Sequence, residues 1–90
     1  MTTTAATVSV TLKLYASLGV HLPDGHARNA AEVAVAEGTT IDSLLDYHGV
    51  PREARHLVLL NGVFQHPGTR GNVILKGGDA VAVWPPVAGG

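Results

Sequence analysis

Cysteine is absent from this chain of 90 residues, and its absence excludes several kinds of site. Disulfides, thiolate zinc sites, cysteine-ligated iron–sulfur clusters and a cysteine nucleophile all require the missing thiol. The single methionine, Met1, carries a thioether, which is not a nucleophile. Any sulfur that this protein handles therefore does not sit on a thiol side chain.

Charge of either sign is also scarce. The chain has six basic residues against seven acidic ones, and neither sign gathers into a stripe. A nucleic-acid backbone is bound by clustered positive charge, so we expect no nucleic-acid partner. No apolar run is long enough to cross a bilayer, and the opening MTTTAAT lacks the basic start and apolar stretch of a signal peptide. We therefore expect no membrane partner and a cytoplasmic location.

Alternating apolar residues predict two strands in the first half of the chain. Residues 8–14 alternate apolar and polar, which is the period of a strand with one face on a core. A loop rich in helix and strand breakers follows over residues 19–29. Residues 30–36 then alternate again, which predicts a second strand antiparallel to the first.

One short helix is predicted next. Thr39 or Thr40 can cap it, and Asp42 favours the positive end of the helix dipole. Apolar residues then recur at three-to-four spacing for about two turns. Gly49 fits a left-handed C-terminal cap, and Pro51 prevents the helix from continuing, although a further helical turn can start there.

The second half of the chain predicts a hairpin and a final strand. Residues 57–60 are apolar on both faces and indicate a buried strand. Asn61-Gly62 tolerates the positive φ of a type I′ turn, so residues 63–65 should fold back on that strand. Residues 73–75 are a brief apolar step, and residues 80–84 form the last strand.

No catalytic pair, metal site or phosphate loop stands out. The histidines show no i,i+4 pair on a helix and no cysteine neighbour; they are His21, His26, His48, His56 and His66. Asp42 and Asp46 lie one helical turn apart, and we interpret them as a solvated outer face. Gly77-Gly78-Asp79 leads into a strand, whereas phosphate loops open a helix, so we expect a tight turn there.

The order of strand, strand, helix and further strands predicts an α+β fold with one main helix packed across a mixed sheet. The first and last strands can lie parallel at its centre, with the helix in the crossover, as in the ubiquitin-like β-grasp arrangement. We predict a single domain over residues 1–84 and an extended tail over residues 85–90. Phe64 and Trp84 can lie in the core or contribute to an exposed apolar docking patch beside the tail, and position on a strand favours the core.

The tail, PPVAGG, is the segment in which we expect the function. Pro85 and Pro86 end the strand because neither donates to a ladder, and they fix part of the path of the tail. Gly89 lacks a β-carbon that would collide with the walls of a narrow channel, and the extended tail spans about 20 Å. We therefore predict that the Gly90 carboxylate is the reactive group. The predicted partner contacts are Trp84, Pro85, Pro86, Val87, Ala88 and Gly89.

Four segments, taken in order, also carry a family resemblance: VTLKLYASL, TTIDSLLDYHGVP, LVLLNGVF and KGGDAVAVWPPVAGG. They resemble the MoaD/ThiS family of ubiquitin-like sulfur carriers over about residues 8–90. Within that family, the ending PPVAGG is most similar to MoaD, the small subunit of molybdopterin synthase.

The resemblance implies a protein that is acted on by others. An E1-like enzyme would use ATP to adenylate the Gly90 carboxylate, and a sulfur donor would then convert it to a thiocarboxylate. A catalytic partner, the large subunit of molybdopterin synthase or a similar acceptor, would take the sulfur into molybdopterin for a molybdenum or tungsten cofactor. The chain itself would be a non-catalytic small subunit with no bound cofactor and no metal.

Three alternatives remain open at this point. The chain can be a ubiquitin-like modifier that is joined through Gly90 to lysine, or a sulfur carrier for another pathway such as thiazole formation. It can also be a β-grasp interaction domain whose tail is chemically idle. Deletion of Gly89 and Gly90 would leave the biological role intact only in the last case.

Overall fold

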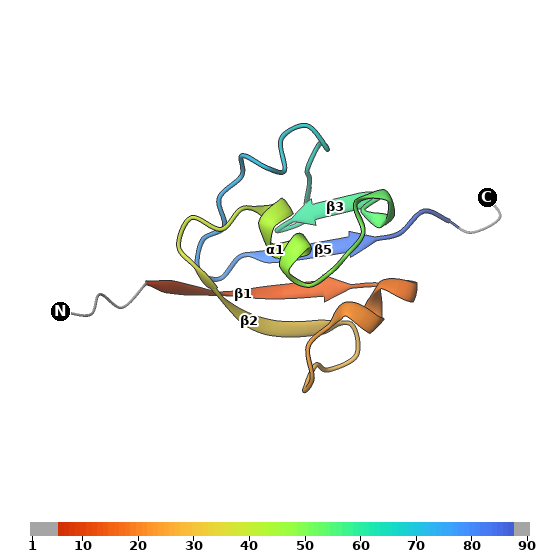
Figure 1. Ribbon diagram of the computed structural model, residues 1–90, viewed down its shortest axis with the longest axis horizontal. Helices are drawn as coiled ribbons and strands as arrows, with labels where there is room; N and C mark the ends of the chain where they lie inside the picture. Colours follow the sequence, from red (N-terminus) through yellow and green to blue (C-terminus); the bar gives the residue numbers. More distant parts are fainter. Residues whose placement is uncertain (1–5, 88–90) are drawn as a thin grey trace.

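The computed structural model describes residues 6–87, which form a mixed sheet crossed by one α-helix (Figure 1). In these residues the sheet has five strands in the order β2-β1-β5-β3-β4. The strands are β1 (Thr7–Leu14), β2 (Ala30–Ala36), β3 (Leu57–Leu60), β4 (Val63–Phe64) and β5 (Ala80–Trp84). The helix is α1 (Ile41–Tyr47), and two 3₁₀ turns are η1 (Ala16–His21) and η2 (Arg52–Ala54).

The central pair of the sheet confirms the topology expected from the sequence. β1 and β5 lie side by side and parallel, whereas β2 pairs with β1, and β3 with β5, in the antiparallel sense. The hairpin between β3 and β4 turns at Asn61 and Gly62, whose φ values of 51° and 83° are those that the turn requires. The parallel pair fixes the direction in which the chain leaves the sheet after β5.

The core lies between the sheet and α1. Every second residue of β1 points into it, and Leu12 and Leu14 are fully buried. The helix supplies Ile41, Leu44 and Leu45, at the spacing that places three side chains on one face. Each fully buried Leu or Ile contributes about 2 kcal/mol relative to exposure. The sheet thus has one covered face and one open face.

The ends of α1 follow the local sequence signals. The Thr40 hydroxyl accepts a hydrogen bond from the Ser43 N–H at 3.1 Å, so Thr40, and not Thr39, is the N-cap. After His48, Gly49 adopts a φ of 77°, the left-handed conformation of a helix end. The helix is therefore short because both of its ends are fixed by side-chain or backbone geometry.

Asp46 is exposed as expected, but Asp42 is only partly exposed, and the two carboxylates do more than form a solvated outer face. Both carboxylates bind the guanidinium of Arg55, which is buried; the distances are 3.1 Å from Nη1 to Asp42 and 2.6 Å from Nη2 to Asp46. Arg55 also donates to the Val50 carbonyl through Nε and Nη2. The hydrogen bond from Arg55 lowers the pKa of Asp46. The network ties α1 to the segment that leads into β3.

Two further expectations are corrected by the structure, which also shows the brief apolar step in more detail. A loop was expected over residues 19–29, but the 3₁₀ turn η1 begins before it and includes its first three residues. In β3 only Val58 is fully buried, so the strand is not buried on both faces. In the step over residues 73–75, Ile74 forms only an isolated bridge with Thr40, while Leu75 is buried in the core.

Among residues 6–87, no helix is long and apolar enough to cross a membrane.

Candidate functional site

The site begins at the end of β5, which is held on both sides as far as Trp84. On one side Tyr15 N–H donates to the Val83 carbonyl at 3.1 Å, and on the other His56 N–H donates to the Trp84 carbonyl at 3.1 Å. Trp84 also lies opposite Leu57 of β3. The last residue of the strand is therefore anchored to two neighbouring segments, and the chain leaves the sheet from a fixed point.

The Trp84 side chain lies on the open face of the sheet. Its neighbour Val83 points into the core, so Trp84 must point the other way. The indole stacks on the ring of Tyr15, with ring centroids 4.3 Å apart and parallel planes. Such a pair contributes about 1 kcal/mol beyond its buried area. The stack holds the half-buried Trp84 in one orientation beside the first residues of the tail.

Pro85 to Val87 continue beyond the end of β5 and lead away from the sheet (Figure 1). Pro85 is half-buried, whereas Pro86 is exposed and Val87 is 82% exposed. Ala88, Gly89 and Gly90 lie outside the described residues, so the predicted roles of their backbone and of the Gly90 carboxylate stay predictions. The part of the tail that is described is available to a partner.

An apolar surface on the open face lies next to the exit of the tail. We call it the open-face patch, and its members alternate with core residues along β3 and β5, lie on the exposed strand β4, or precede η1. Ala82 lies opposite Leu59, which in turn lies opposite Phe64. The patch consists of Tyr15, Leu57, Leu59, Phe64 and Trp84.

Phe64 is 52% exposed, so the core location predicted for it was wrong. It belongs to a two-residue edge strand, and its partner Leu59 faces away from α1. The sequence did contain a signal for this patch, because residues 57–60 are apolar at consecutive positions. Val58 of this run meets the core, whereas Leu57 and Leu59 stay half-buried on the open face.

The turn that precedes β5 is fixed by a carboxylate. Asp79 accepts hydrogen bonds from Asn61 Nδ2 at 2.9 Å and from Lys76 N–H at 2.8 Å. These two bonds, with the Asn61 contact first, lower the pKa of Asp79. Asn61 also accepts from Ala80 N–H at 2.8 Å. The hairpin turn and the start of β5 are thereby joined.

Nothing in the described part of the chain gathers into a metal site: residues 6–87 contain no group of three or more His, Asp or Glu side chains placed to hold an ion. Lys13 lies opposite Ala82 and so adds a positive charge beside the open-face patch. What these residues offer is a rigid anchor, an exposed path and an apolar docking surface.

A family model described as the ThiS family matches residues 24–90 of the chain. Among solved structures, the HVO 2177 protein of Haloferax volcanii is 26% identical, with a TM-score of 0.68 over 93% of this chain and 88% of that chain. SAMP1 from Haloferax volcanii is 28% identical, with a TM-score of 0.59 over 91% of this chain and 99% of that chain.

A third solved structure is described as molybdopterin converting factor, subunit 1, from Pyrococcus furiosus. It is 21% identical, with a TM-score of 0.61 over 89% of this chain and 99% of that chain. At this identity the likeness concerns the fold alone. Among the curated proteins, no sequence matches the chain.

Proposed function

Because the chain belongs to the ThiS family, we propose that it is a sulfur carrier whose Gly90 carboxylate is adenylated and then converted to a thiocarboxylate. The family comprises ubiquitin-like sulfur carriers and modifiers, and the β-grasp fold predicted from the sequence is confirmed. The observation that carries the proposal is the extent of the family match, which runs through Gly90.

The chemistry requires an activated end group. A carboxylate resists nucleophiles because it is negatively charged and lacks a good leaving group. In the proposed reaction, its oxygen attacks the α-phosphorus of ATP on an E1-like enzyme, and pyrophosphate leaves. A hydrosulfide ion supplied by a donor then attacks the carbonyl carbon and displaces AMP, and the resulting thioacid loses its proton. The product is a thiocarboxylate, and this chain contributes only the carboxylate and its presentation.

The described residues support this role through the path of the tail. Ordering a flexible tail costs about 1 to 2 kcal/mol per residue. Pro85 and Pro86 reduce that cost because the φ of each is fixed before binding. The hydrogen bonds that hold Val83 and Trp84 keep the start of the path in place. The proposal assigns threading through the partner's channel to Ala88 and Gly89.

The open-face patch is proposed as the docking surface for the E1-like enzyme and, after sulfur transfer to the carrier, for the sulfur acceptor. Phe64 and Trp84 supply the aromatic area that dominates many interfaces. Because both partners must reach the same end group, they would bind in turn and not together. ATP is used by the partner and is not expected to bind to this chain.

We propose molybdopterin synthesis as the pathway, with the large subunit of molybdopterin synthase as the acceptor. The support is the resemblance of the ending PPVAGG to MoaD. The test is the intact mass of the protein isolated from its own host: a species heavier by one oxygen-to-sulfur exchange at Gly90 is expected. Only carboxylate, with the activating enzyme and sulfur donor present, would contradict the proposal.

A second function is favoured by one specific observation. The solved structure of SAMP1 is 28% identical over 91% of this chain, and a relative of that name is described as a small archaeal modifier protein. A modifier would join Gly90 to the amine of a lysine. Mass spectrometry of host proteins distinguishes the two, because a peptide carrying a Gly90 to lysine link arises only from conjugation.

A further inference from the structure

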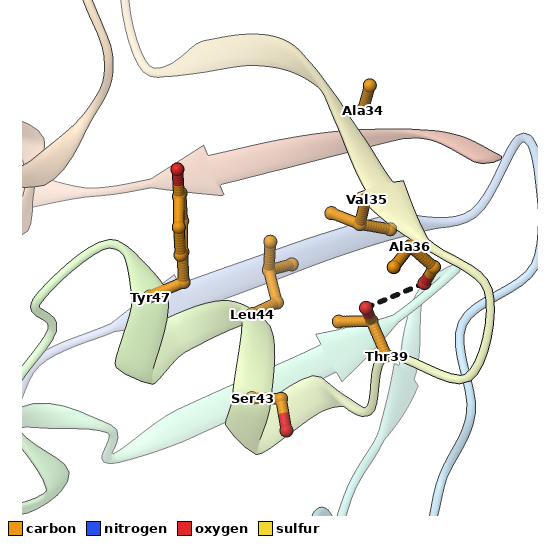
Figure 2. A pocket seen from close by; sticks show the side chains of 7 residues that line it. All are labelled: Ala34, Val35, Ala36, Thr39, Ser43, Leu44 and Tyr47. Atoms are coloured by element: carbon orange, nitrogen blue, oxygen red, sulfur yellow. Dashed lines mark hydrogen bonds between the residues drawn. The ribbon is translucent and has the colours of Figure 1, made fainter. Parts of the chain in front are cut away.

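A hollow of about 390 Å³ lies between β2 and α1, on the covered side of the sheet (Figure 2). Val35 from β2 and Leu44 from α1 form its floor, and the Tyr47 ring stands at one end. Thr39 stands at the other end, where its hydroxyl donates to the Ala36 carbonyl, and Ser43 lines the hollow from α1. Tyr47 is 85% exposed although most of its ring is apolar. We call this hollow the β2–α1 groove.

The groove borders an edge of the sheet. β2 is an outer strand, so only one of its sides is paired. Leu14 N–H donates to the Asn29 carbonyl at 2.8 Å, and Glu37 N–H donates to the Ala6 carbonyl at 3.0 Å. In an antiparallel ladder, only every second residue of a strand directs its N–H and C=O groups toward a given neighbouring strand. Asn29 and Glu37 bond toward the β1 side, so the odd-numbered residues of β2 face β1. The even-numbered residues turn theirs outward.

Local turns use the outward groups only at the two ends of β2. Ala30 exchanges two bonds of 2.9 Å with Ala27, and the Ala36 carbonyl accepts from the Thr39 N–H and hydroxyl. Within residues 6–87, this leaves the N–H and C=O groups of Glu32 and Ala34 without a backbone partner. Unpaired edge groups of this kind accept an added strand.

From this geometry we propose that an extended segment of a partner protein adds to β2 as a further strand. Its backbone pairs with Glu32 and Ala34, and one apolar side chain enters the β2–α1 groove between Leu44 and Tyr47.

Charge favours a basic partner over a second copy of this chain. Residues 30–37 carry two carboxylates, those of Glu32 and Glu37, and no basic side chain. Both residues are exposed. If two copies paired antiparallel about Val33, Glu32 would lie opposite Ala34 of the second copy, and the two Glu32 side chains would be diagonal neighbours about 7 Å apart. Lysine or arginine on the partner strand instead complements these charges.

The groove and the tail lie at different places. Ala36, which lines the groove, pairs with Thr7 at the start of β1. Trp84, where the tail begins, follows Val83, which pairs with Leu14 at the end of β1. β1 also separates β2 from β5 in the sheet. A partner strand on β2 therefore leaves the tail and the open-face patch accessible, and both surfaces can be occupied together.

The test uses the full chain labelled with ¹⁵N and a capped peptide probe, RVIVIR. NMR titration should shift the amide signals of Glu32, Ala34 and Tyr47, and saturation should slow hydrogen exchange at Glu32 and Ala34. The same peptide with alternate backbone amides methylated keeps its side chains but loses the N–H groups that would donate to β2. Its binding should therefore vanish. The acidic peptide EVIVIE should bind more weakly than RVIVIR.

Variants locate the binding. Tyr47→Ala should raise the Kd of RVIVIR about tenfold. Val20→Ala, which removes a side chain that is 83% exposed on η1, should leave it unchanged. Ala34→Pro should abolish binding while keeping the ladder to β1, because the lost N–H points outward. If that variant misfolds, the methylated peptide provides the same test.

Several results would overturn the proposal. One is that the amide signals of β2 do not shift at millimolar peptide, and another is that only signals of the open-face patch shift. A third is that the methylated peptide binds as tightly as RVIVIR. Protection of Glu32 and Ala34 in the free protein, together with a dimer in sedimentation equilibrium, would show that a second copy occupies the edge instead.

Discussion

Asp79 is a single side chain on which the start of β5 depends. Its carboxylate accepts from Asn61 Nδ2 and from Lys76 N–H, and these bonds lower its pKa below the ordinary value of 3.8. Asp79 is partly exposed, so water competes for its carboxylate and the gain in stability is modest. The charged form is the one that the folded state favours.

We predict that Asp79→Asn lowers the free energy of unfolding by about 1 kcal/mol near neutral pH. The unfolded chain binds the proton more readily, so the contribution of Asp79 is complete above its unfolded pKa of 3.8 and is lost as pH falls through the lower folded value. Urea unfolding of both proteins at pH 7 and pH 3 measures this. Equal differences at the two pH values would contradict the linkage, and Asp24→Asn on the exposed loop is the control.

Residues whose role depends on their immediate neighbours could be predicted from the sequence. The burial and ion pairs of Arg55 could not. Asn61-Gly62 signals a turn by its own backbone preferences, and the structure has positive φ at both positions. The burial of Arg55 depends on Asp42, Asp46 and Val50, which lie 13, 9 and 5 residues away. No periodic pattern marks such a network, because its members belong to different elements.

At the scale of elements, α1 is held to the rest of the fold from two sides. Its apolar face packs on the sheet, and its carboxylates bind Arg55, whose side chain is 2% exposed. Arg52 binds the same two carboxylates from the surface, with a side chain that is 68% exposed. The two arginines therefore offer a comparison of buried and exposed ion pairs in one network.

We predict that Arg55→Met lowers the free energy of unfolding by about 3 kcal/mol, because it leaves the Asp42 carboxylate and the Val50 carbonyl without their buried partner. The matched variant Arg52→Met should change it by less than about 0.5 kcal/mol. Thermal or urea unfolding of both variants checks the contrast. Equal losses would mean that burial of Arg55 does not set the strength of the network.

Helices and strands whose apolar residues recur at a regular spacing could be predicted from the sequence. The exposure of their side chains could not. The alternation in residues 8–14 and 30–36 predicted β1 and β2, and the three-to-four spacing predicted α1. The run over residues 57–60 predicted a strand but not its exposure. Apolar residues on both faces indicate two buried faces, whereas here one face of β3 stays partly exposed.

At the scale of the whole molecule, the open-face patch should serve binding and not stability. Phe64→Ala removes a half-exposed ring, so we predict a loss of less than about 1 kcal/mol in unfolding free energy. In adenylation by the cognate E1-like enzyme, it should raise KM about tenfold with little change in kcat. Steady-state kinetics with Val20→Ala as the control tests this. A fall in kcat at unchanged KM would contradict a docking role.

The tail and the domain should also respond independently to mutation. The core of the domain is built from residues 10–83, so Gly89→Ala should leave the unfolding midpoint unchanged. We predict that it slows adenylation at least about tenfold, because an added β-carbon obstructs passage through a narrow channel. Gly19→Ala is the matched control, since its β-carbon would meet no atom within 4 Å. Normal adenylation of Gly89→Ala, measured by pyrophosphate release, would remove the steric explanation of the two terminal glycines and leave only their position in the chain.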